Sequence, residues 1–154
     1  MKLAEALHLR ADLQKRIAQL ADRLKNNARV QDGDTPAEDP AVLLAELADN
    51  TDRLAYLIAS INKTNAATVS DGITLTELIA KKDALALRIS ILRAFLTEAS
   101  PKVERYSAKE IRVVSTVSVR DLQKQLDGLS KELRELDVRL QGLNWTVDLI
   151  ENPD

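Results

Sequence analysis

Residues 119–150 read VRDLQKQLDGLSKELRELDVRLQGLNWTVDLI, and an aliphatic residue recurs there at alternating spacings of three and four. This spacing places side chains on one face of an α-helix and is typical of helices that pack as coiled coils. We therefore predict a helix over residues 118–151. Its predicted buried face consists of Val119, Leu122, Leu126, Leu129, Leu133, Leu136, Leu140, Leu143, Val147 and Ile150.

The composition extends this helical prediction to the rest of the chain. Of 154 residues, 45% are hydrophobic, 30% are charged, only 3% are aromatic and four are glycine, a mixture that favours long helices. The length suits one domain, which we place at residues 1–154. The predicted fold is all-α, a bundle of about four long amphipathic helices with coiled-coil-like packing and one short irregular or extended segment. The helices are expected at about 2–27, 40–66, 74–99 and 118–151.

Local signals support the helix boundaries. Asp39 can cap a helix that has Pro40 at its first position. Thr74 and Glu77 form a capping-box pattern, which predicts that the third helix begins there. The buried faces of the first three helices are expected to comprise Leu3, Ala6, Leu13, Ile17, Leu20 and Leu24; then Leu43, Leu47, Leu54, Leu57, Ile58 and Ile61; then Leu78, Leu85, Ile89, Leu92 and Leu96.

Residues 102–118 are the ambiguous segment. Residues 111–117 read IRVVSTV and are rich in β-branched residues, whereas Ser107 and Glu110 have the spacing of a second capping box. We predict a short strand or an extended crossing here.

Several classes of function are not expected from this sequence. The formal charge of -2 argues against nucleic-acid binding, which needs a concentrated basic surface. We find neither a signal-peptide pattern nor a stretch apolar enough to span a membrane, so we predict a cytoplasmic protein with no membrane partner. Cysteine, a zinc-ligand spacing, a glycine-rich phosphate loop and a Ser-His-Asp arrangement are all missing, so no catalytic residue and no cofactor are predicted.

Two sets of residues are candidates for binding. Glu5 and His8 form a Glu-x-x-His pair, the spacing used by metal sites in helical bundles, although a solvent-facing pair is the alternative. Polar residues that interrupt apolar faces or lie in the ambiguous segment are candidates for a small-ligand site, although buried asparagines often only fix helix register. These are Asn62, Asn65, Arg105, Tyr106, Glu110 and Asn144.

A second apolar row is expected on the last helix, opposite its heptad face. It comprises Val138, Gly142, Trp145 and Leu149, spaced four, three and four. Because tryptophan often anchors interfaces, we predict that this row contacts another copy of the chain, in a dimer or a dimer-based higher assembly. Coverage by residues 102–118 of the same chain is the alternative.

Charge is also unevenly distributed. Residues 31–52 hold seven acidic residues and no basic ones, while residues 102–124 hold six basic and three acidic residues. We predict either docking of these two regions or a solvated acidic face.

A family resemblance is carried by short segments along the whole chain. They are KLAEAL (2–7), RADLQ (10–14), VQ (30–31), PAEDP (36–40), IN (61–62), TN (64–65), RYS (105–107), EI (110–111), LQ (122–123), RELD (134–137) and NW (144–145). Through them the chain resembles the septicolysin-like family of small, helical, oligomer-forming bacterial proteins. The resemblance implies a helical fold and self-association, and the family name implies a cytolysin.

These observations together predict a non-enzymatic, homo-oligomeric helical scaffold or interaction protein. A metal- or small-ligand-binding helical-bundle protein is the first alternative. A cytolysin-like toxin is the second, although the sequence lacks the long amphipathic insertion segment expected of a pore-former.

Overall fold

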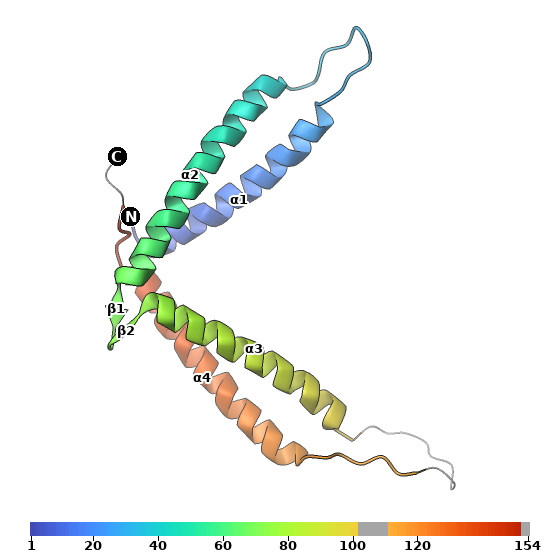
Figure 1. The fold of residues 1–154 in the computed structure, drawn as a ribbon, viewed down its shortest axis with the longest axis vertical. Helices are drawn as coiled ribbons and strands as arrows, with labels where there is room; N and C mark the ends of the chain where they lie inside the picture. Colours follow the sequence, from blue (N-terminus) through green and yellow to red (C-terminus); the bar gives the residue numbers. More distant parts are fainter. Residues whose placement is uncertain (102–110, 152–154) are drawn as a thin grey trace. The chain divides into compact units, whose positions relative to one another are not determined.

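The computed structural model describes residues 1–101 and 111–151. Within them lie four helices, α1 (Leu3–Asn26), α2 (Pro40–Ala67), α3 (Leu75–Ala99) and α4 (Val119–Thr146), and one hairpin of β1 (Val69–Ser70) and β2 (Ile73–Thr74) (Figure 1). The predicted all-α fold of about four long helices is therefore confirmed, and α4 ends five residues earlier than expected.

Local capping explains where the helices begin. The Asp39 carboxylate accepts a hydrogen bond from the Ala41 amide at 2.9 Å, and Pro40 is the first residue of α2. Ser118 accepts one from the Asp121 amide at 3.3 Å at the start of α4. The capping-box pattern predicted the start of α3 correctly, because Thr74 directly precedes its first residue, Leu75.

The chain forms two compact units. The first comprises residues 1–76 and 141–154, and the second comprises residues 77–140. The prediction of a single domain stays a prediction.

In the first unit, α1 and α2 lie antiparallel and side by side (Figure 1). Their apolar faces are buried against each other in the predicted 3–4 pattern, at Leu3, Ala6, Leu13, Leu20, Leu43, Leu57 and Ile61. Two polar side chains, Ser60 and Thr64, are also fully buried. The face of α2 differs here from the prediction, because Ile58 is 38% exposed and Thr64, not Asn62, continues the buried face.

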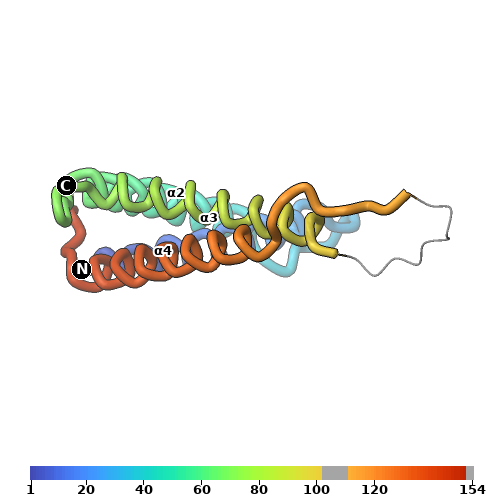
Figure 2. Tube along the Cα trace, turned by 90° about the horizontal axis from the view of Figure 1, so that it is seen from below, coloured from blue at the N-terminus to red at the C-terminus, as the bar shows by residue number. Residues whose placement is uncertain are grey.

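In the second unit, α3 and α4 run antiparallel (Figures 1 and 2). The buried residues all belong to the predicted faces and are Leu78, Leu85, Ile89 and Leu96 of α3 with Leu126, Leu136 and Leu140 of α4. The predicted Leu122, Leu129 and Leu133 are only half-buried, and Ile150 lies beyond the end of α4 and is 43% exposed. Lys82 occupies a position on the same face of α3 and donates a 2.6 Å hydrogen bond to Asp137 of α4. Lys82 is the one basic residue that the heptad of α3 places at the contact with α4, and Asp137 compensates its charge.

The sequence prediction missed the β-hairpin. Val69 pairs with Thr74 and Ser70 with Ile73 in antiparallel register. Asp71 and Gly72 form the turn with φ angles of 49° and 82°, as a two-residue type I′ turn requires. An Asp-Gly pair between short β-prone segments is a known hairpin signal, so this element was predictable from the sequence.

The segment before α4 was predicted to be a short strand or an extended crossing. Residues 111–118 form no strand, so the first alternative is not found in this described part of the segment, and the extended crossing stays a prediction. Their side chains are exposed, and a lone β-branched segment has no partner strand among the described residues to supply backbone hydrogen bonds. Ser107 and Glu110 lie outside the described residues.

Among the described residues, no helix is both long enough and apolar enough to cross a membrane.

The buried heptad of α4 gives the first testable prediction. Leu136 is 8% exposed, so Leu136→Ala should lower the free energy of unfolding by about 2–5 kcal/mol. Leu133 is only half-buried, so Leu133→Ala should cost less. Urea unfolding measures both, with the exposed Gln125→Ala as the control, expected within about 0.5 kcal/mol of wild type. Equal losses for Leu136→Ala and Gln125→Ala would show that this face is not buried.

Candidate functional site

The two ends of the described chain meet in the first unit. The Leu3 amide donates to the Val147 carbonyl at 3.0 Å, and the Leu149 amide donates to the Met1 carbonyl at 2.9 Å. Lys2 and Asp148 form the antiparallel bridge between these two bonds. The segment after α4 is thereby fixed beside the start of α1.

Side chains of Lys2 and Asp148 reinforce this pairing. The Lys2 ammonium lies 2.7 Å from the Asp148 carboxylate and donates to the Thr146 carbonyl at 3.1 Å, at the last residue of α4. A cation at a helix C-terminus is favourable because it meets unpaired carbonyl groups there. The hydrogen bond from Lys2, together with its charge, lowers the pKa of Asp148.

A buried threonine ties the same segment to α2. The Thr64 hydroxyl donates to the Ser60 carbonyl at 2.8 Å and accepts from the Ile150 amide at 2.9 Å. Both hydrogen-bonding capacities of this fully buried hydroxyl are therefore used. The Ser60 hydroxyl, also fully buried, has no hydrogen-bond partner among the described residues.

A shallow, open hollow lies beside this junction. It has a volume of about 430 Å³ and is lined by Met1, Glu5, His8, Leu9 and Asp12. The imidazole of His8 also lies against Trp145, with ring centroids 6.2 Å apart and planes inclined at 43°. The predicted pair Glu5 and His8 thus lines one hollow, and Trp145 is a neighbour of His8.

The position of Glu5 bears on the predicted metal site. Its carboxylate accepts a hydrogen bond from the Lys2 amide at 2.7 Å, which stabilises the first turn of α1. Among the described residues, no three His, Cys, Asp or Glu side chains are grouped closely enough to hold a metal ion. Metal binding by Glu5 and His8 stays a prediction.

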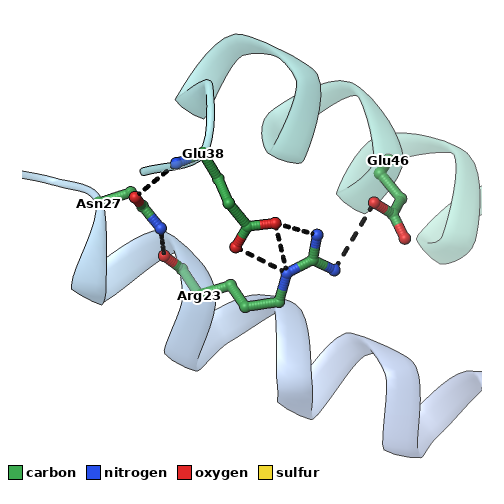
Figure 3. A network of polar contacts seen from close by, with 4 residues as sticks. All are labelled: Arg23, Asn27, Glu38 and Glu46. Carbon is green, nitrogen blue, oxygen red and sulfur yellow. Dashed lines mark hydrogen bonds and ion pairs between the residues drawn. The ribbon is translucent and has the colours of Figure 1, made fainter. Parts of the chain in front are cut away.

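A polar network joins the other end of α1 to the loop before α2 (Figure 3). The Arg23 guanidinium donates to both carboxylate oxygens of Glu38, at 2.6 Å from Nη2 and 3.1 Å from Nε, and lies 3.8 Å from Glu46. Asn27 ends α1 by donating to the Arg23 carbonyl at 2.8 Å and accepting from the Glu38 amide at 2.9 Å. Two of the seven acidic residues in 31–52 therefore have a basic partner within their own unit.

The predicted small-ligand residues are placed only in part. Arg105, Tyr106 and Glu110 lie outside the described residues. Asn62 is exposed and Asn65 half-buried on α2, while Asn144 is half-buried on α4. No hydrogen bond joins the two helices through these asparagines among the described residues, so the structure does not assemble them into one site.

The predicted interface row on α4 is shorter than expected. Val138 and Trp145 are 72% and 56% exposed, and Gly142 is exposed as well. Leu149 does not belong to this row, because α4 ends at Thr146 and the Leu149 side chain is 7% exposed. Burial of Leu149 follows from the pairing of its backbone with Met1, which depends on tertiary structure.

A larger apolar surface lies on α3, where the sequence analysis identified only one face. Leu87, Ile91 and Phe95 are 63%, 60% and 44% exposed and follow each other at intervals of four, one helical turn apart. Leu87 and Ile91 lie opposite the buried Leu85, Ile89 and Leu96, and Phe95 lies between the two faces. We call the exposed surface that contains Leu87, Ile91 and Phe95 the outer row of α3. Its signal, a second apolar repeat within 77–98, is visible in the sequence.

The network around Arg23 gives a prediction about pH. The hydrogen bonds from Arg23 lower the pKa of Glu38 in the folded chain. A carboxyl group whose pKa is lower in the folded chain than in the unfolded chain stabilises the fold at pH values above its pKa in the unfolded chain. This stabilisation is lost as the pH falls through the pKa in the folded chain. Glu38→Gln should therefore melt at a lower temperature than wild type at neutral pH, and this difference should shrink below about pH 4.3, the usual pKa of glutamate.

Thermal melts over this pH range test that expectation. Glu46→Gln is the matched control, because Glu46 lies 3.8 Å from the guanidinium and makes the weaker contact. A difference between wild type and Glu38→Gln that does not change on acidification would contradict the assignment.

Comparison with known proteins identifies the family. No curated protein matches the chain. The crystal structure of "a functionally unknown conserved protein from Corynebacterium diphtheriae" is 39% identical in sequence and covers 97% of this chain and 99% of its own, with a TM-score of 0.91. The description of that protein does not mention septicolysin, so the resemblance to the septicolysin-like family stays a prediction. The sequence profile of a family of unknown function, DUF6847, matches residues 10–149, and the chain therefore belongs to the DUF6847 family.

Proposed function

We propose that this protein is a non-enzymatic helical scaffold or interaction protein that works by binding other copies of itself. The observation that carries the proposal is the outer row of α3, which leaves Leu87, Ile91 and Phe95 exposed while the opposite face of α3 is buried. The proposal retains the coiled-coil-like packing, the cytoplasmic location and the lack of nucleic-acid or membrane partners expected from the sequence.

The physical reason is the cost of apolar surface in water. An amphipathic helix at the surface of a monomer needs one apolar stripe, and its other side is normally polar. The outward face of α1 follows that rule, with residues such as Asp12, Lys15 and Gln19 exposed. On α3, each large exposed side chain of the outer row could contribute about 1.5–3 kcal/mol if it were fully buried in an interface.

Other exposed apolar side chains point in the same direction. Val42 and Leu44 of α2 are 62% and 55% exposed, and Trp145 of α4 is 56% exposed. Trp145 already lies against His8 of its own unit, so part of its surface is used within the chain. The outer row of α3 has the more regular spacing and is the surface on which the proposal depends.

The proposal predicts an assembly larger than one 17.1 kDa chain. Sedimentation equilibrium and light scattering over a range of micromolar concentrations measure the mass directly. We expect a concentration-dependent dimer or a higher assembly based on dimers. A mass of one chain at every concentration would contradict the proposal.

A second candidate function is the binding of a metal or small ligand in the hollow beside His8. The small-ligand version is favoured by the open hollow itself, which is lined by both polar and apolar side chains. Metal analysis of protein purified without chelator tests the metal version. Stoichiometric metal in wild type and its loss in His8→Ala would support it, and metal-free wild type would exclude a tightly bound ion.

A further inference from the structure

The outer row of α3 has the spacing of a complete second heptad. Its positions are separated by three and four residues in strict alternation, and all of them are exposed. They are Glu77, Ala80, Ala84, Leu87, Ile91, Ala94 and Glu98. Phe95, the third large exposed residue of the outer row, lies beside this heptad, one turn after Ile91. One face of α3 is therefore packed within its own unit, and the opposite face carries the residue pattern of a helix–helix contact.

The residue types on this face indicate a contact between two helices. If Ala84 and Ile91 occupy a positions, Ala80, Leu87 and Ala94 occupy d positions. Among parallel coiled coils, a β-branched residue at a with leucine at d favours two helices over three or four. The alanines let two helix backbones approach closely, while Glu77 and Glu98 would place like charges together at the ends and so limit the contact to residues 80–94.

The flanking charges select the parallel orientation. Asp83 falls at a g position and Arg88 at the following e position. In a parallel pair, a g residue of one helix lies beside the e residue five positions later on the other, so two Asp83–Arg88 ion pairs form by symmetry. In an antiparallel pair, e faces e and g faces g, and these opposite charges do not meet.

Both charged side chains are available for such a contact. Asp83 and Arg88 are exposed, and neither forms an ion pair or hydrogen bond with another described residue through its side chain. Lys82, in contrast, is on the inward face and is already paired with Asp137. The charge pattern beside the outer row therefore complements a second copy of the same helix.

We propose that α3 of one chain pairs in parallel with α3 of a second copy through the outer row, with Asp83 of each copy binding Arg88 of the other. This inference rests on the proposed self-association and adds the surface, the orientation and the residues. Only five layers of side chains meet, at positions 80, 84, 87, 91 and 94, so the contact is concentration-dependent.

Sedimentation equilibrium of single variants tests the surface. Ile91→Lys introduces a charge at an exposed position, so the fold and the far-ultraviolet helical signal should be retained while the dissociation constant rises at least tenfold. The matched control is Val42→Lys, an equally exposed apolar residue on α2, which should leave the dissociation constant unchanged, as should Trp145→Ala.

A charge exchange tests the ion pair. Asp83→Arg and Arg88→Asp should each weaken association, because each places two like charges together across the pair. The double variant restores opposite charges and should recover most of the wild-type association. Independent, additive losses in the double variant would overturn the proposed contact.

Cross-linking tests the orientation, and the chain contains no cysteine of its own. In a parallel pair, position 80 meets position 80, so the Ala80→Cys variant should form a disulfide-linked dimer on mild oxidation. In an antiparallel pair each layer joins an a residue to a d residue, so position 80 would meet position 91. Failure of Ala80→Cys to cross-link, with efficient cross-linking of an equimolar mixture of the Ala80→Cys and Ile91→Cys variants, would show an antiparallel pair and overturn the inference.

The outcomes separate this inference from the proposed function. If wild type is a monomer at every concentration, both fail. If wild type associates but Ile91→Lys associates equally well, or if Val42→Lys or Trp145→Ala alone dissociates the assembly, self-association stands and the α3 pairing is wrong.

Discussion

Each long helix of this protein buries one face on which apolar residues alternate at spacings of three and four, and the rest of the structure depends on that burial. The pairing of α1 with α2 and of α3 with α4 follows from it, because leucines on facing helices leave water together. The heptad face also determines which residues point outward. Loops, caps and ion pairs then refine an arrangement that this burial has already set.

Polar interactions mainly fix ends and register. Arg23 with Glu38 joins the loop before α2 to the end of α1, and Lys82 with Asp137 aligns α3 with α4. Exposed or half-exposed ion pairs of this kind contribute little free energy, because water and salt screen the charges. Their effect is to disfavour alternative registers, in which a charged group would lie against leucines without a partner.

Function is best sought on the surfaces that folding of the single chain leaves apolar. The DUF6847 family and its structural relative carry no described activity, so neither assigns one to this chain. On α3, the same residue spacing that forms the inner contact is repeated on the outer face. A helix with two such faces is suited to join one copy of the chain to another.

The sequence by itself determined the four helices to within a few residues, because heptads and the caps at Asp39 and Thr74 act locally. The hairpin turn at Asp71 and the outer row of α3 also had local signals in the sequence. The sequence analysis did not use the Asp-Gly pair, and it identified only one apolar face on α3. Only the tertiary structure decided the burial of Leu149 and the double hydrogen bond of Thr64, and only it brought His8 against Trp145. Each of these joins residues far apart in the chain, and no periodicity within one helix specifies which distant backbone group or side chain will meet it.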